Sequence, residues 1–240
     1  HRQDAEVHRR AGLAGGRRVL RYALDHSADI DAVITNQSMD GSRFVLHTPV
    51  GDADVVLPLA GRHNIANALA AAAVALALDV PLETVVAGLE QVGGVAGRLE
   101  VEAMPGNWTL IDDSYNANPG SVTAAIDTLA LAGGERFLVL GDMAELGPNA
   151  RALHAAVGAH AKVRGLDRLF AVGALSAAAV EAFGEGALHF ASKEALVAAL
   201  QPLLHAGVTC LVKGSRSSGM DQVVAALRPP SERGGADHAA

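Results

Sequence analysis

The chain has 240 residues, enough for one large domain or two modest ones. Half of the residues are hydrophobic, 3% are aromatic, and 26 Gly and 9 Pro are distributed among them, which excludes collagen-like and disordered classes. A formal net charge of −7 disfavours nucleic-acid binding, although it is compatible with a local basic site for a small anion. The single cysteine, Cys210, lies in an apolar run and is expected to be a reduced, buried thiol.

The sequence indicates neither a membrane span nor a secretory leader. Its longest apolar stretch, residues 68–78, is too short to cross a bilayer, and no signal peptide is recognisable. We therefore expect a cytoplasmic protein without membrane insertion, and a monomer. The chain starts with His1 in a charged, patternless stretch, so we expect it to be a piece of something longer.

The first part of the chain predicts an antiparallel sheet followed by helices. Asp40-Gly41 and Gly51-Asp52 are turn signals between short strand-like runs. The predicted strands are residues 18–24, 32–37, 43–48 and 54–59. An Ala/Leu/Val run at 65–78 is too long for a strand and too apolar for a surface helix, so it predicts a buried helix; a second helix is expected at 82–91. The glycine-rich segment 93–97 predicts a hinge between two domains.

Beyond the hinge, strands and helices alternate five times, which predicts an α/β fold with a doubly wound parallel sheet. The expected strands are 108–112, 137–140, 168–172, 188–190 and 208–212. A helix is expected to begin at Pro119 with Asn118 as its cap. Further helices are expected at 151–164, 175–183, 193–204 and 222–227. The polar tail 229–240 is expected to be disordered.

Polar clusters follow three of these strands, at residues 112–118, 141–145 and 213–216. Ligands collect at the carboxyl ends of strands in such sheets, so the coincidence favours a site, although each cluster alone could be a loop that caps the next helix. Asp112 and Asp113 are adjacent in a strand and should point to opposite faces, so one of them should face the site. Lys213 and Arg216 bring positive charge that suits a carboxylate or a phosphate.

Another polar cluster, residues 61–68, opens the predicted buried helix. Asn64 and Asn67 lie one turn apart and offer donors and acceptors to a base edge. The alternative is that Asn64 caps the helix and Asn67 is satisfied internally. The ten histidines show no metal-ligand spacing, so no metal site is expected in this chain. Neither the phosphate-loop pattern nor the dinucleotide-binding glycine pattern occurs in the sequence.

Five segments, taken together, resemble the Mur ligases, in order and at matching spacing from about Gly15 to Leu227. They are LPLAGRHNIANALA at 57–70, GRLE at 97–100, IDDSYNANP at 111–119, VLGDMAELG at 139–147 and LVKGSRS at 211–217. Tyr115 and the segment 141–147 are most similar to the member of the family that takes D-alanyl-D-alanine.

This resemblance implies two domains and a reaction. Residues 1–95 would be the last part of a central ATPase domain, made of antiparallel strands and buried helices. Residues 96–228 would be a Rossmann-like C-terminal domain that binds the amino substrate. The implied reaction uses ATP and Mg²⁺ to join D-alanyl-D-alanine to a UDP-N-acetylmuramoyl-tripeptide through an acyl phosphate, in peptidoglycan precursor synthesis. The family's phosphate loop, magnesium ligands and N-terminal domain would lie upstream of His1, so this chain alone is expected to be inactive.

The resemblance also implies roles for individual residues. Asn64 and Asn67 would face the adenine, while Arg98 and Asp113 would contact phosphate and ribose as cofactor-binding and catalytic groups. The substrate site would be lined by Tyr115, Asn116, Asn118, Ser215 and Arg216. Within it, Arg216 is expected to bind the dipeptide carboxylate, with Ser215 assisting and an asparagine near the amine. Two alternatives stay open: a related ATP-dependent ligase such as a folylpolyglutamate synthetase, or a truncated, non-catalytic binding module.

Overall fold

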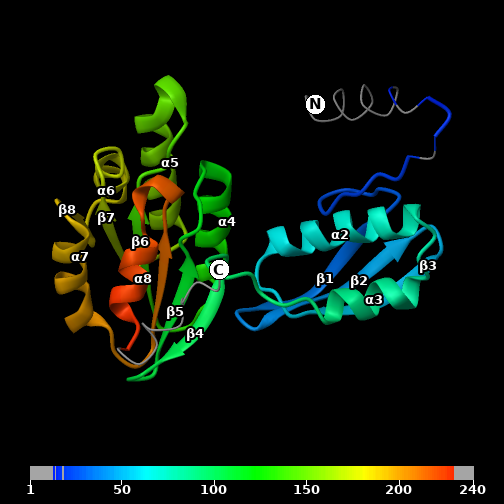
Figure 1. Ribbon diagram of the computed structural model, residues 1–240, viewed down its shortest axis with the longest axis horizontal. Helices are drawn as coiled ribbons and strands as arrows, with labels where there is room; N and C mark the ends of the chain where they lie inside the picture. The colour runs from blue at the N-terminus through cyan, green and yellow to red at the C-terminus, as the bar shows by residue number, and fades with distance from the viewer. Residues whose placement is uncertain (1–12, 14, 18, 230–240) are drawn as a thin grey trace, which may run out of the picture. The chain divides into compact units, whose positions relative to one another are not determined.

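The computed structural model describes residues 13, 15–17 and 19–229. The chain divides into two compact units, residues 1–92 (unit 1) and 93–240 (unit 2) (Figure 1). Of the tail expected to be disordered, residues 230–240 lie outside the described part. The boundary between the units falls just before the glycine-rich segment 93–97, whose last residues form a closed turn in which the Arg98 N–H donates to the Val95 carbonyl at 2.9 Å.

Unit 1 is an antiparallel sheet packed against two helices. The strands β1 (Asp31–Ser38), β2 (Gly41–Thr48) and β3 (Gly51–Leu57) lie in that order and are joined by two-residue turns. The helices α2 (Arg62–Ala77) and α3 (Leu82–Glu90) follow. The three strands predicted between residues 32 and 59, and both helices, are confirmed.

The core of unit 1 lies between one face of the sheet and one face of α2. Alternate residues of β2, such as Phe44 and Leu46, pack with Ile65 and Leu69 of α2. The other side of α2 is exposed, including Val74 at 63%. The helix predicted to be buried is therefore buried on one face only.

The strand predicted at 18–24 is wrong over the residues that the structure describes there. Tyr22 makes only an isolated bridge with Ile30, and the chain bends at 24–26. The Asp29 carboxylate accepts the Arg21 N–H at 2.8 Å, so a side chain takes a donor that a ladder would use.

Unit 2 is a six-stranded sheet in the order β4-β5-β9-β6-β7-β8. The five predicted strands pair in parallel: β5 (Trp108–Asp113), β6 (Glu135–Gly141), β7 (Arg168–Val172), β8 (Ala187–Phe190) and β9 (Val208–Lys213). The sixth strand, β4 (Glu100–Met104), was not predicted; it pairs antiparallel with β5 at the edge and makes the sheet mixed.

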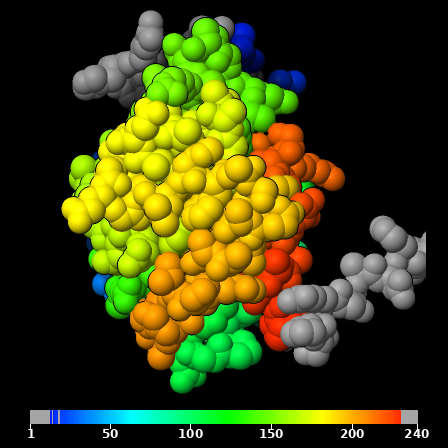
Figure 2. All heavy atoms as spheres, turned by 90° about the vertical axis from the view of Figure 1, so that its left-hand side faces the viewer, coloured from blue at the N-terminus to red at the C-terminus, as the bar shows by residue number. Residues whose placement is uncertain are grey.

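Helices cover both faces of this sheet, as a doubly wound fold requires. They are α4 (Pro119–Leu129), α5 (Ala150–Val163), α6 (Ala177–Phe183), α7 (Lys193–Leu200) and α8 (Asp221–Leu227), with 3₁₀ turns at 147–149, 201–203 and 216–218. On one face, α7 and α8 bury alternate strand residues such as Phe137, Val139 and Cys210. The helices α4, α5 and α6 pack side by side on the other. Figure 2 looks onto the surface that the segments from α6 to α8 form, in yellow to red. No helix in the described part of the chain is long and apolar enough to cross a membrane.

Candidate functional site

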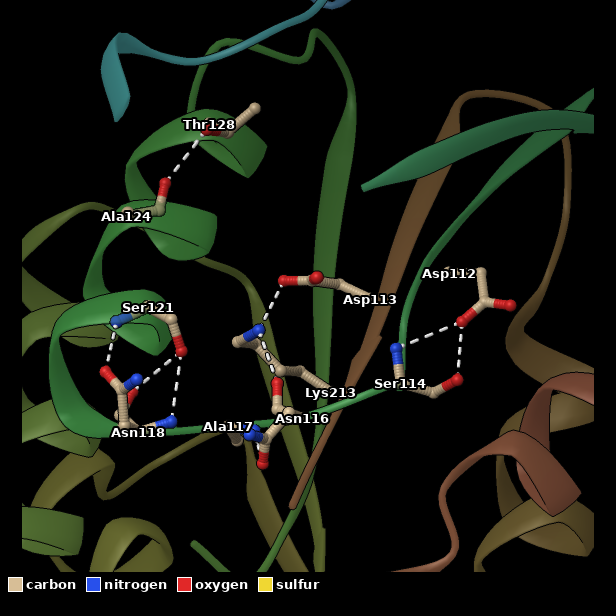
Figure 3. A network of polar contacts seen from close by, with 10 residues as sticks. All are labelled: Asp112, Asp113, Ser114, Asn116, Ala117, Asn118, Ser121, Ala124, Thr128 and Lys213. Carbon is tan, nitrogen blue, oxygen red and sulfur yellow. Dashed lines mark hydrogen bonds and ion pairs between the residues drawn. The ribbon is translucent and has the colours of Figure 1, made fainter. Parts of the chain in front are cut away.

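The carboxyl end of β5 carries two buried carboxylates that point to opposite faces of the sheet, as the alternation of a strand predicts (Figure 3). Asp112 accepts the N–H of Ser114 at 3.0 Å and its hydroxyl at 2.6 Å. Asp113 accepts from the ammonium of Lys213, the last residue of β9, at 2.5 Å. The two carboxylates therefore have different partners and do not share a proton.

The ion pair of Asp113 and Lys213 is nearly inaccessible to water, with 8% and 2% of these residues exposed. Burial raises the pKa of Asp113 above its usual value, and the attraction of Lys213 opposes that effect. The Lys213 ammonium also donates to the Asn116 carbonyl at 3.0 Å. The expectation that Lys213 offers its charge to a bound anion is thus corrected, because Asp113 and a backbone carbonyl already engage it.

The loop after β5 uses its asparagines to shape its own backbone. The Asn118 carboxamide oxygen accepts the Ser121 N–H at 2.9 Å and the Ser121 hydroxyl accepts the Asn118 N–H at 3.0 Å, which is a capping box at the start of α4. The Asn116 oxygen accepts the Ala117 N–H at 2.9 Å. Both side chains are exposed at the strand end. The hydrogen bonds above use their carboxamide oxygens, so their amide nitrogens can donate to a ligand.

Two guanidinium groups lie against one exposed aromatic ring. The centre of the Arg98 guanidinium is 4.6 Å from the centroid of the Tyr115 ring, and that of Arg216 is 5.7 Å from it. Tyr115 is 45% exposed. The sequence placed these three residues in distant motifs, and the fold brings them together as a cationic, aromatic patch that suits an anionic group.

A third carboxylate, that of Asp142 directly after β6, connects three segments. Its side chain accepts the N–H groups of Leu175 at 3.1 Å and Ser176 at 2.7 Å, ahead of α6. Its carbonyl accepts both the N–H of Ser215 at 3.0 Å and the hydroxyl of Ser215 at 2.7 Å. Ser215 is therefore buried and held against β6, while the neighbouring Arg216 is exposed.

His154 was not recognised from the sequence, and it supports the same edge of the sheet. It is fully buried in α5; its Nε2 accepts the Met143 N–H at 2.9 Å and its Nδ1 donates to the Ala150 carbonyl at 2.7 Å. These two partners require a neutral ring with its proton on Nδ1. The spacing of the ten histidines in the sequence gave no signal that would have singled out His154. Met220, which precedes α8, is fully buried in the core of unit 2 and is not available to a ligand.

In unit 1, the two asparagines of the other cluster lie next to one another on the first turns of α2. The Asn64 amide donates to the Ala60 carbonyl at 2.8 Å, and the Asn67 amide lies 3.4 Å from the Asn64 oxygen. Gly61, with φ of +93°, is the cap residue, and no side chain caps the helix. Asn67 is exposed, so its carboxamide oxygen faces solvent at the helix start.

One group of carboxylates has the spacing of a metal site. Single oxygen atoms of Glu100, Glu102 and Asp112 lie within 4.8 Å of one another. The Arg228 guanidinium binds Glu102, with Nε at 3.1 Å, and lies 3.4 Å from Asp112. This arginine supplies the positive charge at the cluster, so the residues present do not fit a magnesium ion there.

Comparisons with known proteins give the family. The model of the Mur ligase middle domain matches residues 2–75, and that of the Mur ligase glutamate ligase domain matches residues 97–216. The UDP-N-acetylmuramoyl-tripeptide--D-alanyl-D-alanine ligase of Escherichia coli (strain K12) is 48% identical over 220 residues, which cover 90% of this chain and 48% of that protein.

Two solved structures have the same fold. MurF from Acinetobacter baumannii superposes with a TM-score of 0.83 at 35% identity, covering 90% of this chain and 48% of that one. MurF ligase from Thermotoga maritima, solved in complex with ADP, superposes with a TM-score of 0.77 at 20% identity, covering 91% of this chain and 50% of that one. The chain spans about half the length of the curated relatives it matches. The two matched domains and these relatives show that the chain belongs to the Mur ligase family.

Proposed function

We propose that this chain carries the dipeptide-binding part of an ATP-dependent ligase that joins D-alanyl-D-alanine to a UDP-N-acetylmuramoyl-tripeptide in peptidoglycan precursor synthesis. In such a reaction, the terminal carboxylate of the tripeptide takes the γ-phosphoryl group of ATP, which gives an acyl phosphate and releases ADP. The dipeptide amine then attacks the acyl carbon, and phosphate leaves as the amide forms. The 48% identity with a ligase named for D-alanyl-D-alanine favours this dipeptide over glutamate as the amino substrate.

The patch formed by Arg98, Tyr115 and Arg216 is the observation that carries the proposal. A dipeptide zwitterion needs a cation for its carboxylate and hydrogen-bonding groups near its amine. Arg216 is exposed beside Tyr115, and its guanidinium can bind a carboxylate with two parallel hydrogen bonds. Asn116 and Asn118 follow Tyr115 in the same loop, so their carboxamides are assigned to the polar groups of the dipeptide, with Ser215 supporting Arg216.

The nucleotide roles form part of the same proposal. Asn64 and Asn67 present amide groups that can read an adenine edge. Arg98 is assigned to the phosphate, where it would stabilise the charge that develops during transfer. Asp113 is assigned to the ribose and phosphate region. We assign no magnesium ligand to this chain, because Arg228 supplies the cation at its one carboxylate cluster of suitable spacing in the described residues.

The remaining assignments follow from this chemistry. Residues 1–95 are proposed as the C-terminal part of the central ATP-binding domain and residues 96–228 as the amino-substrate domain. Because it uses ATP and a nucleotide-linked precursor, the protein is proposed to act in the cytoplasm. It is also proposed to be a monomer. The chain alone, which has no phosphate-loop pattern, should neither hydrolyse ATP nor form the amide.

Calorimetric titration of the chain with D-alanyl-D-alanine, and with glutamate, tests the proposal. We expect the dipeptide to bind and glutamate to bind at least tenfold more weakly. Arg216→Ala should weaken dipeptide binding roughly ten- to a hundredfold, since hydrogen bonds to charged groups contribute about 1.5–3 kcal/mol. Arg151→Ala is the matched control, because Arg151 is an exposed arginine of unit 2 that pairs with Glu181 at 2.6 Å. Preference for glutamate, or equal losses in both variants, would contradict the proposal.

A further inference from the structure

Lys213 holds two parts of the candidate site at once. It ends β9 and lies beside Asp113 in the parallel register of β5 and β9, so both side chains leave the same face of the sheet. Its ammonium lies 2.5 Å from the Asp113 carboxylate and 3.0 Å from the Asn116 carbonyl (Figure 3). The first contact fixes the end of a strand, and the second fixes the middle of the loop assigned to the dipeptide.

Asp113 also contacts the segment that carries Arg98. The backbone of Leu99 interacts with the Asp113 carboxylate and lowers its pKa. Leu99 has a φ of +50°, a conformation that costs an L-residue about 1–2 kcal/mol, so the segment must be held in place by its neighbours.

Two further contacts join the same segments. The Tyr115 N–H donates to the Gly97 carbonyl at 3.1 Å, and the Arg98 guanidinium lies over the Tyr115 ring. A Cβ on Gly97 would lie 3.3 Å from that of Tyr115, so the two backbones are closely packed. Residues 97–99 and 113–116 therefore form one connected structure, with the Lys213 ammonium beneath it.

A buried ion pair is a poor source of stability, because removing two charges from water costs about as much as their attraction returns. Apolar residues of similar volume could fill this position of the sheet equally well. The ammonium differs from them in providing directed hydrogen bonds to a carboxylate and a carbonyl. Its presence at a nearly fully buried position is therefore better explained by geometry than by stability.

We propose that Lys213 is a positioning residue, whose ammonium sets the place of Arg98 and of the 114–118 loop by holding Asp113 and the Asn116 carbonyl. The consequence for dipeptide binding rests on the proposed function, whereas the consequence for local order does not. Lys213 itself touches neither substrate.

The test compares Lys213→Met with Lys162→Met in the whole chain. Lys162 is a matched control in unit 2, since its ammonium donates to the Glu185 carbonyl at 2.9 Å and lies 4.8 Å from the Phe183 ring centroid. Amide hydrogen exchange without ligand and calorimetric binding of D-alanyl-D-alanine are measured on each. Labelling of the buried Cys210 thiol reports whether unit 2 stays folded.

We expect Lys213→Met to raise exchange at residues 97–99 and 114–117 at least tenfold, and to weaken dipeptide binding at least tenfold, with Cys210 still protected. Lys162→Met should change neither. Lys213→Arg keeps a charged donor and should recover part of the protection. Lys213→Met leaves the buried Asp113 carboxylate without its ion-pair partner. If this exposes Cys210 without denaturant, the double variant Asp113→Asn/Lys213→Met, which removes that charge, replaces the single variant, and the same hydrogen exchange and dipeptide binding are measured.

The possible results separate the two proposals. Local exchange that rises without dipeptide binding in the wild-type chain would support Lys213 as a positioning residue and count against the proposed function. Dipeptide binding in the wild-type chain, with unchanged exchange and affinity in Lys213→Met, would overturn the role of Lys213 alone. Exchange that rises evenly across unit 2, or Lys213→Arg behaving like Lys213→Met, would also overturn it.

Discussion

Replacing Gly173 by Ala tests whether the Asp142 carboxylate organises the edge of the sheet. Gly173 follows β7 with a φ of +121°, and a Cβ there would lie 2.3 Å from an oxygen of Asp142. The new methyl group must therefore push away the carboxylate that accepts the Leu175 and Ser176 N–H groups.

Two costs combine in this variant. The backbone conformation costs an L-residue about 1–2 kcal/mol. Losing one hydrogen bond to a charged acceptor costs about 1.5–3 kcal/mol. We therefore expect Gly173→Ala to lower the free energy of unfolding of unit 2 by roughly 2.5–5 kcal/mol.

The assay is denaturant-dependent labelling of Cys210, which is buried in the sheet of unit 2. Gly133→Ala is the control, because a Cβ at Gly133 meets no atom within 4 Å and its φ is not positive. That variant should change the unfolding free energy by less than about 1 kcal/mol. If Gly173→Ala were equally mild, the carboxylate of Asp142 would not be a fixed structural group, and the argument that it holds this edge would be refuted.

Three further outcomes are expected. Burial raises the pKa of Cys210 to about 12, so at pH 8 the native thiol should react with a labelling reagent at least about a hundredfold more slowly than in denaturant; comparable rates would contradict the burial. In a full-length enzyme containing this chain, Arg98→Ala or Asp113→Asn should lower kcat/KM about a hundredfold or more while Cys210 stays protected, and unchanged turnover in both would remove their assignment. The hydrogen bond with His47 holds the pKa of Asp31 below its usual value, so this pair stabilises unit 1 above about pH 4. The contribution is under about 1 kcal/mol for a surface pair, and it is lost as the pH falls through the lowered pKa. The difference in urea-unfolding free energy between pH 6 and pH 3 should therefore be smaller in Asp31→Asn than in the wild type.

The alternation of strands and helices was sufficient to predict most of the fold. It is a local pattern, and the parallel sheet follows because the short connections leave few other topologies. The strand β4 was not predicted because two of its five residues are glutamates and it has no apolar run, although Glu100, Glu102 and Met104 alternate with smaller residues before a Pro-Gly turn. Residues 19–24 were overpredicted because a side chain, Asp29, competes for the backbone donors.

The candidate site could be placed at the strand ends from the sequence, but its internal contacts could not. Strand alternation placed Asp112 and Asp113 on opposite faces, as the structure has them. The direction of the Lys213 ammonium depends on the register of β9 beside β5, two strands 95 or more residues apart in the chain, and no local pattern encodes that register. For the same reason, the approach of Arg98 and Arg216 to the one ring of Tyr115 could not be predicted.

We propose that D-alanyl-D-alanine binds at the carboxyl edge of the sheet in unit 2. An NMR titration of the isotope-labelled chain with this dipeptide tests it most directly, because every backbone amide reports its own surroundings. We predict that the chemical shifts that change most will belong to residues 97–99, 114–118 and 214–217. Shifts confined to other parts of the chain, or none at millimolar dipeptide, would contradict the claim.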